Sequence, residues 1–500
     1  MWKLWFVGIK HLPARPPSLF VLHPFNPPSF PQQLICFTHS FFCRHATFIH
    51  YRAHGASRRR RRPAHKPARP PVQRRRQKGL CALHGPSPSP TLHVQPLTTP
   101  QLGLTSGQTR EQWRQDIQDA KAAGIDAFIL NAGPTDNYSD EQLDIAYTEA
   151  AAETGFSLAI SFDMNPDLVD AWTVEHVAGW INKFAASPAQ LKVDGKSFVS
   201  TFEGPSWIDN WGAVRDQTGG IYLVPDFSSI GVPGLAEQGY LEKMDGAFSW
   251  DAWAKDGGKK TTDADIGYTD MLAGTGKSYM MGVSPSFFTD IDFYNKNWLW
   301  SSDTLWFDRW EQVLEIAPAF VEVITWNDYG ESHYIGSSPP PVGGPEIADV
   351  HRYVDGVPHG ALRDVLPWYI ASYKAGQKLP VEEDVAVFWY RQNPKAIGDR
   401  SGVMCKVGET LVDPSECVED AVFVLVLAKE DGNVKVEIGE YSEEIPVKAG
   451  SQLVSLQFAG RTGDVRVTLA GQTGQGPTPI TNEAPATGHN FNYFTGSTKQ

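Results

Sequence analysis

The sequence predicts a (β/α)8 TIM-type barrel, with its first strand missing or aberrant, followed by a small C-terminal antiparallel β-sandwich. Three observations predict this α/β class. Runs typical of β-strands alternate with helical segments at intervals of about 23 to 42 residues, which is the pattern of a parallel sheet. Nearly every predicted strand ends in an acidic or polar residue, as in barrels that build an active site at one rim. After about residue 385, short alternating runs replace the helices and indicate a sandwich.

The barrel is predicted from seven strands, which begin near residues 126, 157, 198, 221, 246, 278 and 320. The first predicted helix shows the helical pattern best: Trp113, Ile117 and Ala120 have helical spacing, and Gly124 follows as a stop. Further helices are expected over residues 139–154, 174–186, 207–216, 303–315 and 361–375. An open, doubly wound sheet would also accommodate seven strands, but the acidic strand ends favour a closed barrel.

A closed barrel of this kind needs an eighth strand, and the helix that begins at Thr109 has no convincing strand before it. The upstream candidate, Thr91–Leu97, is short and is broken by Pro96. The first strand is therefore either degraded or absent from this sequence.

The first 95 residues form a basic, Pro-rich and Arg-rich leader that we expect to be disordered or an incorrectly predicted coding sequence. The alternative is a nuclear-targeting or polyanion-binding arm. The start, Leu4–Ile9, resembles a signal peptide only weakly, because its apolar core is short and is followed by Lys10. After the leader we expect the barrel over residues 96–380, the sandwich over 381–475 and a loose tail over 476–500.

Charge is distributed very unevenly along the chain. Residues 1–100 hold 16 of the 44 Lys and Arg residues and no Asp or Glu, so the remainder carries 28 basic against 57 acidic residues. Such an acidic body would repel phosphates, so we expect neither nucleic acid nor membrane as a partner. No run reaches the roughly 20 apolar residues of a membrane-spanning helix. Cys405 and Cys417 could pair across a short loop, which is compatible with secretion.

The polar strand ends are the candidate functional residues. Acids facing one rim suit either metal-assisted chemistry or glycosidic hydrolysis by paired carboxylates. Barrel metal sites usually add histidines, whereas one histidine lies near these strand ends, so we expect no metal and no cofactor. Aromatic residues beside the acids favour a sugar substrate, because sugar rings stack on aromatic faces. The candidates are Asn131, Asp163, Glu203, Asp226, Trp250, Asp251, Trp326, Asp328, Tyr329, Glu331 and His333.

Four segments in order resemble the fungal α-1,3-glucanases, or mutanases, of glycoside hydrolase family 71: Asp116–Phe128, Ser161–Asn165, Phe248–Trp253 and Thr325–Ser332. The resemblance covers about residues 109–475. It implies a (β/α) barrel with a C-terminal β-sandwich, and secreted, inverting hydrolysis of α-1,3-glucan in fungal cell walls. It also implies an extracellular or wall location, although the front of this sequence departs from the family by lacking a clear signal peptide and first strand. We further expect a monomer.

The segment that follows the last predicted strand also resembles the strand-end motif of the family 99 endo-α-mannosidases, in which two acids three residues apart serve catalysis. By that likeness, Asp328 is expected to act as general base or polarising carboxylate and Glu331 as general acid. The other rim residues would bind sugar hydroxyls or tune the acid. The alternative hypothesis is an inactive, glucan-binding or wall-associated protein whose barrel has lost its first strand.

Overall fold

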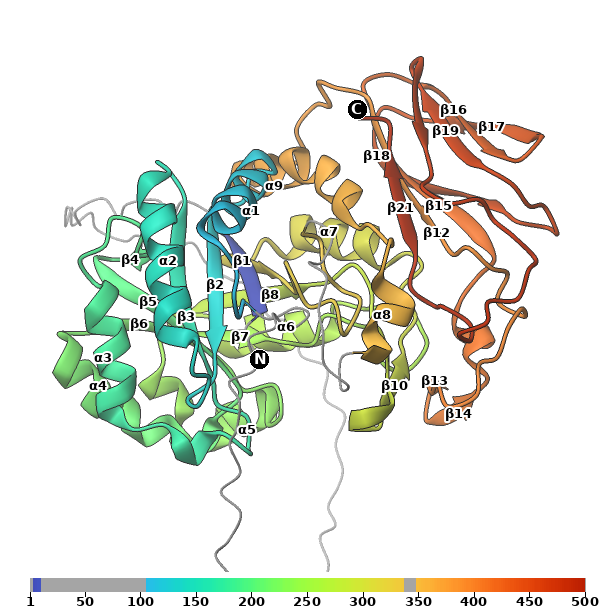
Figure 1. Cartoon of the computed structure of the whole chain (residues 1–500). Helices are drawn as coiled ribbons and strands as arrows, with labels where there is room; N and C mark the ends of the chain where they lie inside the picture. The colour runs from blue at the N-terminus through green and yellow to red at the C-terminus, as the bar shows by residue number, and fades with distance from the viewer. Residues whose placement is uncertain (1–2, 10–104, 337–347, 500) are drawn as a thin grey trace, which may run out of the picture. The chain divides into compact units, whose positions relative to one another are not determined.

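The computed structural model describes residues 3–9, 105–336 and 348–499 (Figure 1). Seven strands form a curled parallel sheet, and each begins within two residues of its predicted position, so these predictions are confirmed. The strands are β2 (Ala127–Ala132), β3 (Ser157–Asp163), β5 (Lys196–Phe202), β6 (Ile221–Asp226), β7 (Gly246–Ser249), β8 (Ser278–Val283) and β11 (Phe320–Val323).

The sheet curls far enough for its parallel strands to pair in one continuous series. β3 pairs with both β2 and β5, and the series continues through β6, β7 and β8 to β11. A short hairpin strand, β4 (Lys192–Val193), lies beside β5. The place between β11 and β2 is taken by β1 (Lys3–Ile9), which runs antiparallel to both neighbours.

β1 occupies the place in the sheet where the first strand of the barrel was expected. The position where a first parallel strand was sought is filled by a segment of the expected leader, and it runs in the opposite direction. Residues 10–95 of that leader and the candidate strand Thr91–Leu97 lie outside the described residues.

Helices alternate with the parallel strands, as the sequence predicts. The α1 N-terminus is fixed by a capping box, in which the Thr109 hydroxyl accepts from the Gln112 N–H and the Gln112 side chain accepts from the Thr109 N–H. The helices of this region are α1 (Arg110–Ala122), α2 (Ser139–Ala152), α3 (Val174–Phe184), α4 (Trp211–Thr218), α5 (Gly231–Glu237), α6 (Asp263–Leu272), α7 (Leu305–Ile316), α8 (Ala348–Val354) and α9 (Leu366–Ala375). Short 3-10 turns are η1 (Val169–Ala171), η2 (Pro205–Asn210), η3 (Tyr240–Lys243), η4 (Asp292–Tyr294), η5 (Gly360–Val365) and η6 (Pro414–Cys417).

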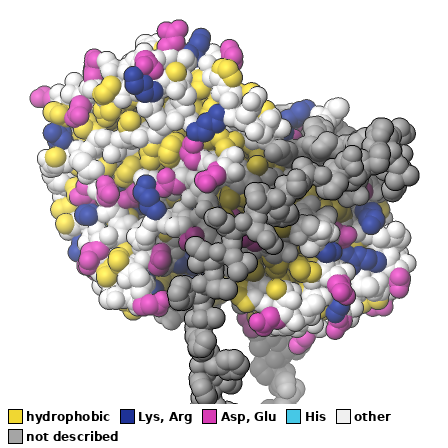
Figure 2. Space-filling model, turned by 180° about the vertical axis from the view of Figure 1, so that it is seen from behind, with side chains coloured by type: hydrophobic (Ala, Val, Ile, Leu, Met, Phe, Trp, Pro, Cys, Tyr) yellow, Lys and Arg dark blue, Asp and Glu magenta, His cyan; other side chains and the backbone are white. Residues whose placement is uncertain are grey.

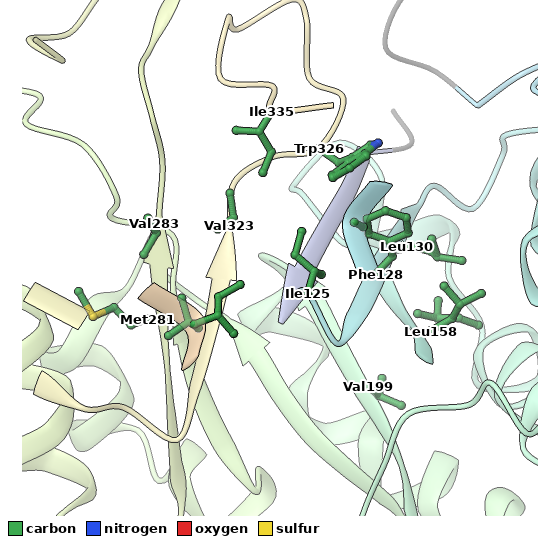
Figure 3. Packing of buried hydrophobic residues seen from close by; sticks show 14 of the residues in the cluster. Ile125, Phe128, Leu130, Leu158, Val199, Met281, Val283, Val323, Trp326 and Ile335 are labelled. Atoms are coloured by element: carbon green, nitrogen blue, oxygen red, sulfur yellow. The ribbon is translucent and has the colours of Figure 1, made fainter. Parts of the chain in front are cut away.

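The two faces of the curled sheet bury different side chains. Leu130, Val199 and Val323 belong to the cluster that packs under the helices (Figure 3). Phe198 and Phe320 come from strands that do not pair with each other, yet their rings lie 5.4 Å apart, so they meet across the enclosed side. Residues two positions apart on a strand share a face. The enclosed side therefore also receives Glu322 and Asp226, which continue the alternation of the inward-facing Phe320 and Val224.

The C-terminal region consists mainly of two four-stranded antiparallel sheets that share one hydrophobic cluster. The first has the order β18 (Gly450–Gln457), β15 (Ala421–Ala428), β12 (Val385–Tyr390), β21 (Phe494–Ser497); the second has the order β17 (Tyr441–Val447), β16 (Gly432–Ile438), β19 (Val465–Leu469), β20 (Gln472–Gln475). β12 is buried on both faces, because Ala386 and Phe388 enter this cluster while Val387 and Trp389 enter the cluster under the helices. The C-terminal region also contains a small hairpin of β13 (Cys405–Val407) with β14 (Thr410–Val412), and a second hairpin, β9 (Phe288–Ile291) with β10 (Lys296–Leu299), lies between β8 and α7.

The end of the chain differs from the expected loose tail over residues 476–500. β21 pairs with β12, and Phe491, Asn492 and Tyr493 are buried. The Tyr493 hydroxyl donates to the Pro285 carbonyl oxygen at 3.1 Å, which ties this segment to the loop after β8. The Thr, Gly and Pro content suggested mobility, but the aromatic side chains supply the burial that fixes the segment.

Two further expectations can be compared with the structure. A disulfide joins Cys405 to Cys417, as the short-loop pairing predicts. None of the helices in the described ranges is long and apolar enough to cross a membrane. On the face drawn in Figure 2, the visible acidic and basic side chains are interspersed.

Candidate active site

The chain after β11 folds back on itself and closes a compact loop. The Thr325 N–H donates to the His333 carbonyl oxygen at 2.9 Å, and the Ile335 N–H donates to the Thr325 carbonyl oxygen at 3.1 Å. Within the loop, the Glu331 N–H donates to Asp328 Oδ1 at 3.1 Å. These bonds bring both expected catalytic acids and the expected histidine into one buried group, whose side chains are at most 12% exposed.

His333 links the two acids. Its Nε2 lies 2.7 Å from Glu331 Oε2 and 3.4 Å from Asp328 Oδ2. Its Nδ1 lies 3.1 Å from the Thr325 hydroxyl, which accepts a bond of 2.8 Å from the Asp328 N–H. With Glu331 ionised, Nε2 donates to Glu331 and Nδ1 accepts from the Thr325 hydroxyl; with Glu331 protonated, Glu331 donates to Nε2 and Nδ1 donates to the Thr325 oxygen. A neutral imidazole therefore satisfies the whole chain of bonds.

The same three side chains offer a possible ligand set for a cation. One ligand atom from each of Asp328, Glu331 and His333 lies within 4.8 Å of the others. Two carboxylates and an imidazole could hold a divalent ion. However, the ammonium of Lys296 contacts Glu331 Oε1 and already supplies positive charge there. The absence of a metal thus stays a prediction, and the Lys296 ammonium supports it.

Three residues that the sequence did not single out as site residues complete this group. Lys296 lies on the β9–β10 hairpin, which has too short a pattern to be predicted. The rings of Trp253 and Phe287 lie 5.4 and 6.0 Å from the His333 ring. Trp253 follows the strand-end acid Asp251 by two residues, which is a signal that could have identified it.

A second polar group lies at the ends of β5, β6 and β7. Glu203 accepts from the Ser229 N–H at 2.8 Å, and Asp226 Oδ1 accepts from the Ser228 N–H at 3.0 Å. The Ser228 hydroxyl donates to Asp226 Oδ1 at 2.5 Å and accepts from the Trp250 N–H at 2.9 Å. Three predicted site residues are therefore connected through two neighbouring serines.

Asp226 is fully buried, and this changes its protonation. Burial, together with the nearby negative charge of Glu203, raises the pKa of Asp226 to about 7. Its Oδ2 has no hydrogen-bond partner among the residues that the structure describes. The carboxyl group does not reach solvent, so the expectation that it binds sugar directly has no support in this conformation.

Glu322 on β11 was not predicted as a site residue, although it precedes the loop that holds Asp328, Glu331 and His333. It is fully buried, and within the described part of the chain neither carboxyl oxygen has a hydrogen-bond partner. Burial, with a further contribution from Asp226, raises the pKa of Glu322 well above its ordinary value. The enclosed side of the sheet thus holds two carboxyl groups that favour their neutral forms.

Asp251 is held by basic side chains instead. Burial alone would raise its pKa, but the ammonium groups of Lys260, at 2.5 Å, and of Lys255 outweigh burial, and the pKa falls below its usual value. Asp251, Trp253 and both lysines help to line a cavity of about 520 Å³. An ionised acid at the edge of a cavity remains compatible with sugar binding.

Asn131 and Asp163 are both buried at neighbouring strand ends. Asn131 Oδ1 accepts from the Ser161 hydroxyl at 3.0 Å, and Asp163 accepts from the Asn165 side chain at 2.8 Å. The Trp250 ring is partly exposed and packs against Phe202, with ring centres 5.0 Å apart. Of these three residues, Trp250 is the one that is partly exposed.

The structure places Trp326 and Tyr329 in the protein interior, contrary to their expected role in sugar binding. Trp326 is 1% exposed, and its ring lies 5.1 Å from the Phe128 ring (Figure 3). The Arg363 guanidinium lies 5.3 Å from the same Trp326 ring. Tyr329 is 6% exposed and packs against Tyr334, at 4.6 Å. β11 ends at Val323, so the alternation that would have turned Trp326 inward no longer applies.

Similar proteins are found both by sequence and by structure. A family model described as glycosyl hydrolase family 71 matches residues 101–500. The chain is 37% identical over 416 residues to "Mutanase Pc12g07500" of Penicillium rubens, which covers 80% of this chain and 87% of that protein. It is 36% identical over 419 residues to "Glucan endo-1,3-alpha-glucosidase agn1" of Schizosaccharomyces pombe, covering 79% of this chain and 92% of that protein. A solved GH99 endo-alpha-mannosidase from Bacteroides thetaiotaomicron is similar with a TM-score of 0.40 and 12% identity, covering 55% of this chain and 82% of that chain.

Proposed function

Because the chain belongs to glycosyl hydrolase family 71, we propose that it is a glycoside hydrolase that cleaves α-1,3-glucan as a glucan endo-1,3-alpha-glucosidase. The relatives that bear this activity in their names match about four fifths of the chain. The observation that carries the proposal is the joining of Asp328 and Glu331 through His333 in one buried loop. Paired carboxylates of this kind are the machinery of glycosidic hydrolysis.

The proposed architecture is a (β/α)8 barrel with a C-terminal β-sandwich. Eight strands pair around the curled sheet when β1 is counted, and the two antiparallel sheets share a core. Five of the seven parallel strands, β3, β5, β6, β7 and β11, carry an acid at or shortly after their C-terminal ends, where such barrels place catalysis. β1 departs from this architecture, since it runs antiparallel to its neighbours.

In the proposed reaction Asp328 acts as general base or polarising carboxylate and Glu331 as general acid. Asn131, Asp163, Glu203, Asp226, Trp250, Asp251 and His333 would shape the sugar site or tune these acids. A polysaccharide substrate would bring the protein to a cell wall or another extracellular glucan, and the Cys405–Cys417 disulfide supports an oxidising location.

The spacing of the two acids is relevant to the stereochemistry of hydrolysis, for which the family resemblance implies inversion. Inverting enzymes keep their two carboxyl groups about 6.5–9.5 Å apart to hold a water molecule, and retaining enzymes about 5–5.5 Å apart. Asp328 and Glu331 have ligand oxygens within 4.8 Å of each other. If hydrolysis inverts, either the two carboxyl groups lie further apart when substrate is bound or the second carboxylate comes from elsewhere on the rim. Early NMR spectra of the released anomers distinguish the outcomes: α-anomer indicates retention by this pair, and β-anomer indicates inversion.

Release of reducing sugar from insoluble α-1,3-glucan tests the activity itself. The wild-type chain should release sugar, and Glu331→Gln should reduce the rate by at least about a hundredfold while keeping the fold, because general acid catalysis contributes about 10²–10⁴-fold. Asp209→Asn, an exposed acid outside the site, serves as the control. Binding of glucan by a folded, soluble sample without any release would instead favour the inactive glucan-binding protein.

A further inference from the structure

A cavity near the end of β7 is lined by both the barrel and the C-terminal region. It has a volume of about 520 Å³, and its lining includes Asp251 and Trp253, which follow β7. Lys406 and Glu409 of the β13–β14 hairpin also line it. Ligand sites in proteins commonly enclose about 300–1,000 Å³ and often lie where two regions of a protein meet. Both the size and the place of this cavity suit a ligand.

The β13–β14 hairpin is fixed to the loop after β7 by close backbone contacts. The Gly408 N–H donates to the Asp256 carbonyl oxygen at 2.7 Å. Gly257 has a φ of +78°, and a Cβ atom at this position would lie 2.1 Å from the Lys406 carbonyl oxygen. The two segments can therefore approach this closely because Gly257 has no side chain. Their spacing is fixed where they line the cavity.

The hairpin is also held from its other side. Cys405, the first residue of β13, is joined to Cys417 by a disulfide. The Met404 N–H donates to the Asn297 carbonyl oxygen at 2.9 Å, and the Leu299 N–H donates to the Met404 carbonyl oxygen at 2.9 Å. These bonds tie the hairpin to β10. A wall that is already ordered loses little conformational freedom when a ligand binds to it.

Trp253 connects the cavity to the loop that holds Asp328, Glu331 and His333. Its ring centre lies 5.4 Å from that of His333, and Trp253 is also part of the cavity lining. One side chain therefore touches both the cavity and the group that contains the two proposed catalytic acids. A polymer bound at those acids has the cavity as its neighbour.

The charges around the cavity indicate what kind of ligand it suits. Four lysines and four acids line it, so neither sign of charge predominates. A strongly anionic ligand would be repelled by the carboxylates, and a cationic ligand by the ammonium groups. A hydroxyl group can donate to a carboxylate and can accept from an ammonium group. The mixed lining therefore suits a neutral ligand that carries many hydroxyl groups.

From these observations we infer that the cavity binds glucose residues of the α-1,3-glucan chain away from the cleaved bond, and that Lys406 and Glu409 of the C-terminal hairpin form hydrogen bonds with their hydroxyl groups. The inference rests on the proposed function, because it adds a binding site for the same polysaccharide. A glucan chain cleaved at Asp328 and Glu331 continues past Trp253 to the hairpin. The C-terminal region thus helps to determine how long a substrate must be to bind tightly.

The test compares a long and a short soluble α-1,3-linked gluco-oligosaccharide as substrates of the full chain and of Lys406→Ala/Glu409→Ala. The variant should raise KM for the long oligosaccharide about tenfold, which corresponds to about 1.4 kcal/mol and to one or two net hydrogen bonds. KM for the shortest oligosaccharide that is cleaved should rise about twofold at most, because it does not reach the hairpin, and kcat should stay the same for both.

Two further variants check the cause of this effect. Lys406→Gln/Glu409→Gln should keep KM for the long oligosaccharide within about threefold of the wild-type value, because amide groups also form hydrogen bonds with hydroxyl groups. Leu411→Ala is the matched control and should leave KM unchanged, because Leu411 is 57% exposed on the same hairpin and lies outside the cavity lining.

Binding of the long oligosaccharide separates the inference from its premise, since it requires no turnover. In full chains that carry Glu331→Gln, addition of Lys406→Ala/Glu409→Ala should raise the Kd about tenfold by calorimetry. Unchanged Kd and KM in a variant of normal thermal stability would overturn the inference and leave the glucanase activity intact, and so would an equal rise of KM for long and short substrates. A wild-type chain that binds the oligosaccharide but releases no sugar would instead overturn the proposed function.

Discussion

Replacing the buried carboxyl group of Asp226 by an amide should remove a large pH dependence of stability. The pKa of Asp226 is raised from 3.8 to about 7, with burial as the main cause. Because the pKa is raised in the folded state, the protonated Asp226 carboxyl group favours folding. Its contribution to the unfolding free energy is complete below the unfolded-state pKa and is lost as the pH rises through about 7. Three pKa units at about 1.4 kcal/mol each give roughly 4 kcal/mol, and about 3 kcal/mol of that change falls between pH 4 and pH 7.

The assay is urea denaturation of the wild type and Asp226→Asn at pH 4, 5, 6 and 7. From pH 4 to pH 7, the unfolding free energy of Asp226→Asn should rise by about 3 kcal/mol relative to that of the wild type. The amide oxygen can still accept from Ser228, and the amide nitrogen replaces an oxygen that lacks a partner in the described structure, so any packing cost should be constant with pH. Asp209→Asn is the exposed control. Parallel pH curves for wild type and Asp226→Asn would refute the burial argument.

Three other changes have expected outcomes. Glu322→Gln should stabilise the protein at pH 7 but not at pH 4, because the pKa of this buried carboxyl is raised well above its ordinary value and ionisation opposes folding; equal effects at both pH values would contradict this. Arg309→Met should cost about 3–5 kcal/mol of unfolding free energy, because it leaves the buried Asp265 carboxylate without the cation 2.8 Å away; a denaturation midpoint within error of wild type would contradict this. Trp326→Ala should lower the unfolding free energy by about 3–5 kcal/mol, because it leaves a cavity in the core. At temperatures where this variant remains folded, its KM for glucan should stay near the wild-type value, and a raised KM would indicate that the indole contacts the sugar.

Sequence patterns predicted the parallel strands well because their signal is local. Each strand is an apolar run followed by a polar end, and α1 carries a complete capping box at Thr109. The grouping of Asp328, Glu331 and His333 was also accessible, since a single loop of nine residues supplies all three together with Thr325.

Contacts between distant segments were not accessible from such patterns. Lys296 reaches Glu331 from a hairpin of four-residue strands, and no local spacing links the two positions. The burial of Trp326 depends on where β11 ends and on Phe128 and Arg363, which come from other elements. β21 is a strand because β12 offers it an edge, whereas its own sequence, Phe494–Ser497, carries little β signal.

The burial of β12 on both faces has a consequence for how the protein unfolds. Its even-numbered side chains belong to one hydrophobic cluster and its odd-numbered side chains to the other, and the Arg391–Asp303 ion pair, at 2.7 Å, joins the same two regions. Neither region can lose its structure without exposing apolar surface of the other, so calorimetry should record one cooperative transition for both. A chain cut before Val385 would leave the odd-numbered face of β12 missing from the cluster under the helices, and recombinant truncation at that boundary should yield aggregates instead of an autonomous catalytic domain.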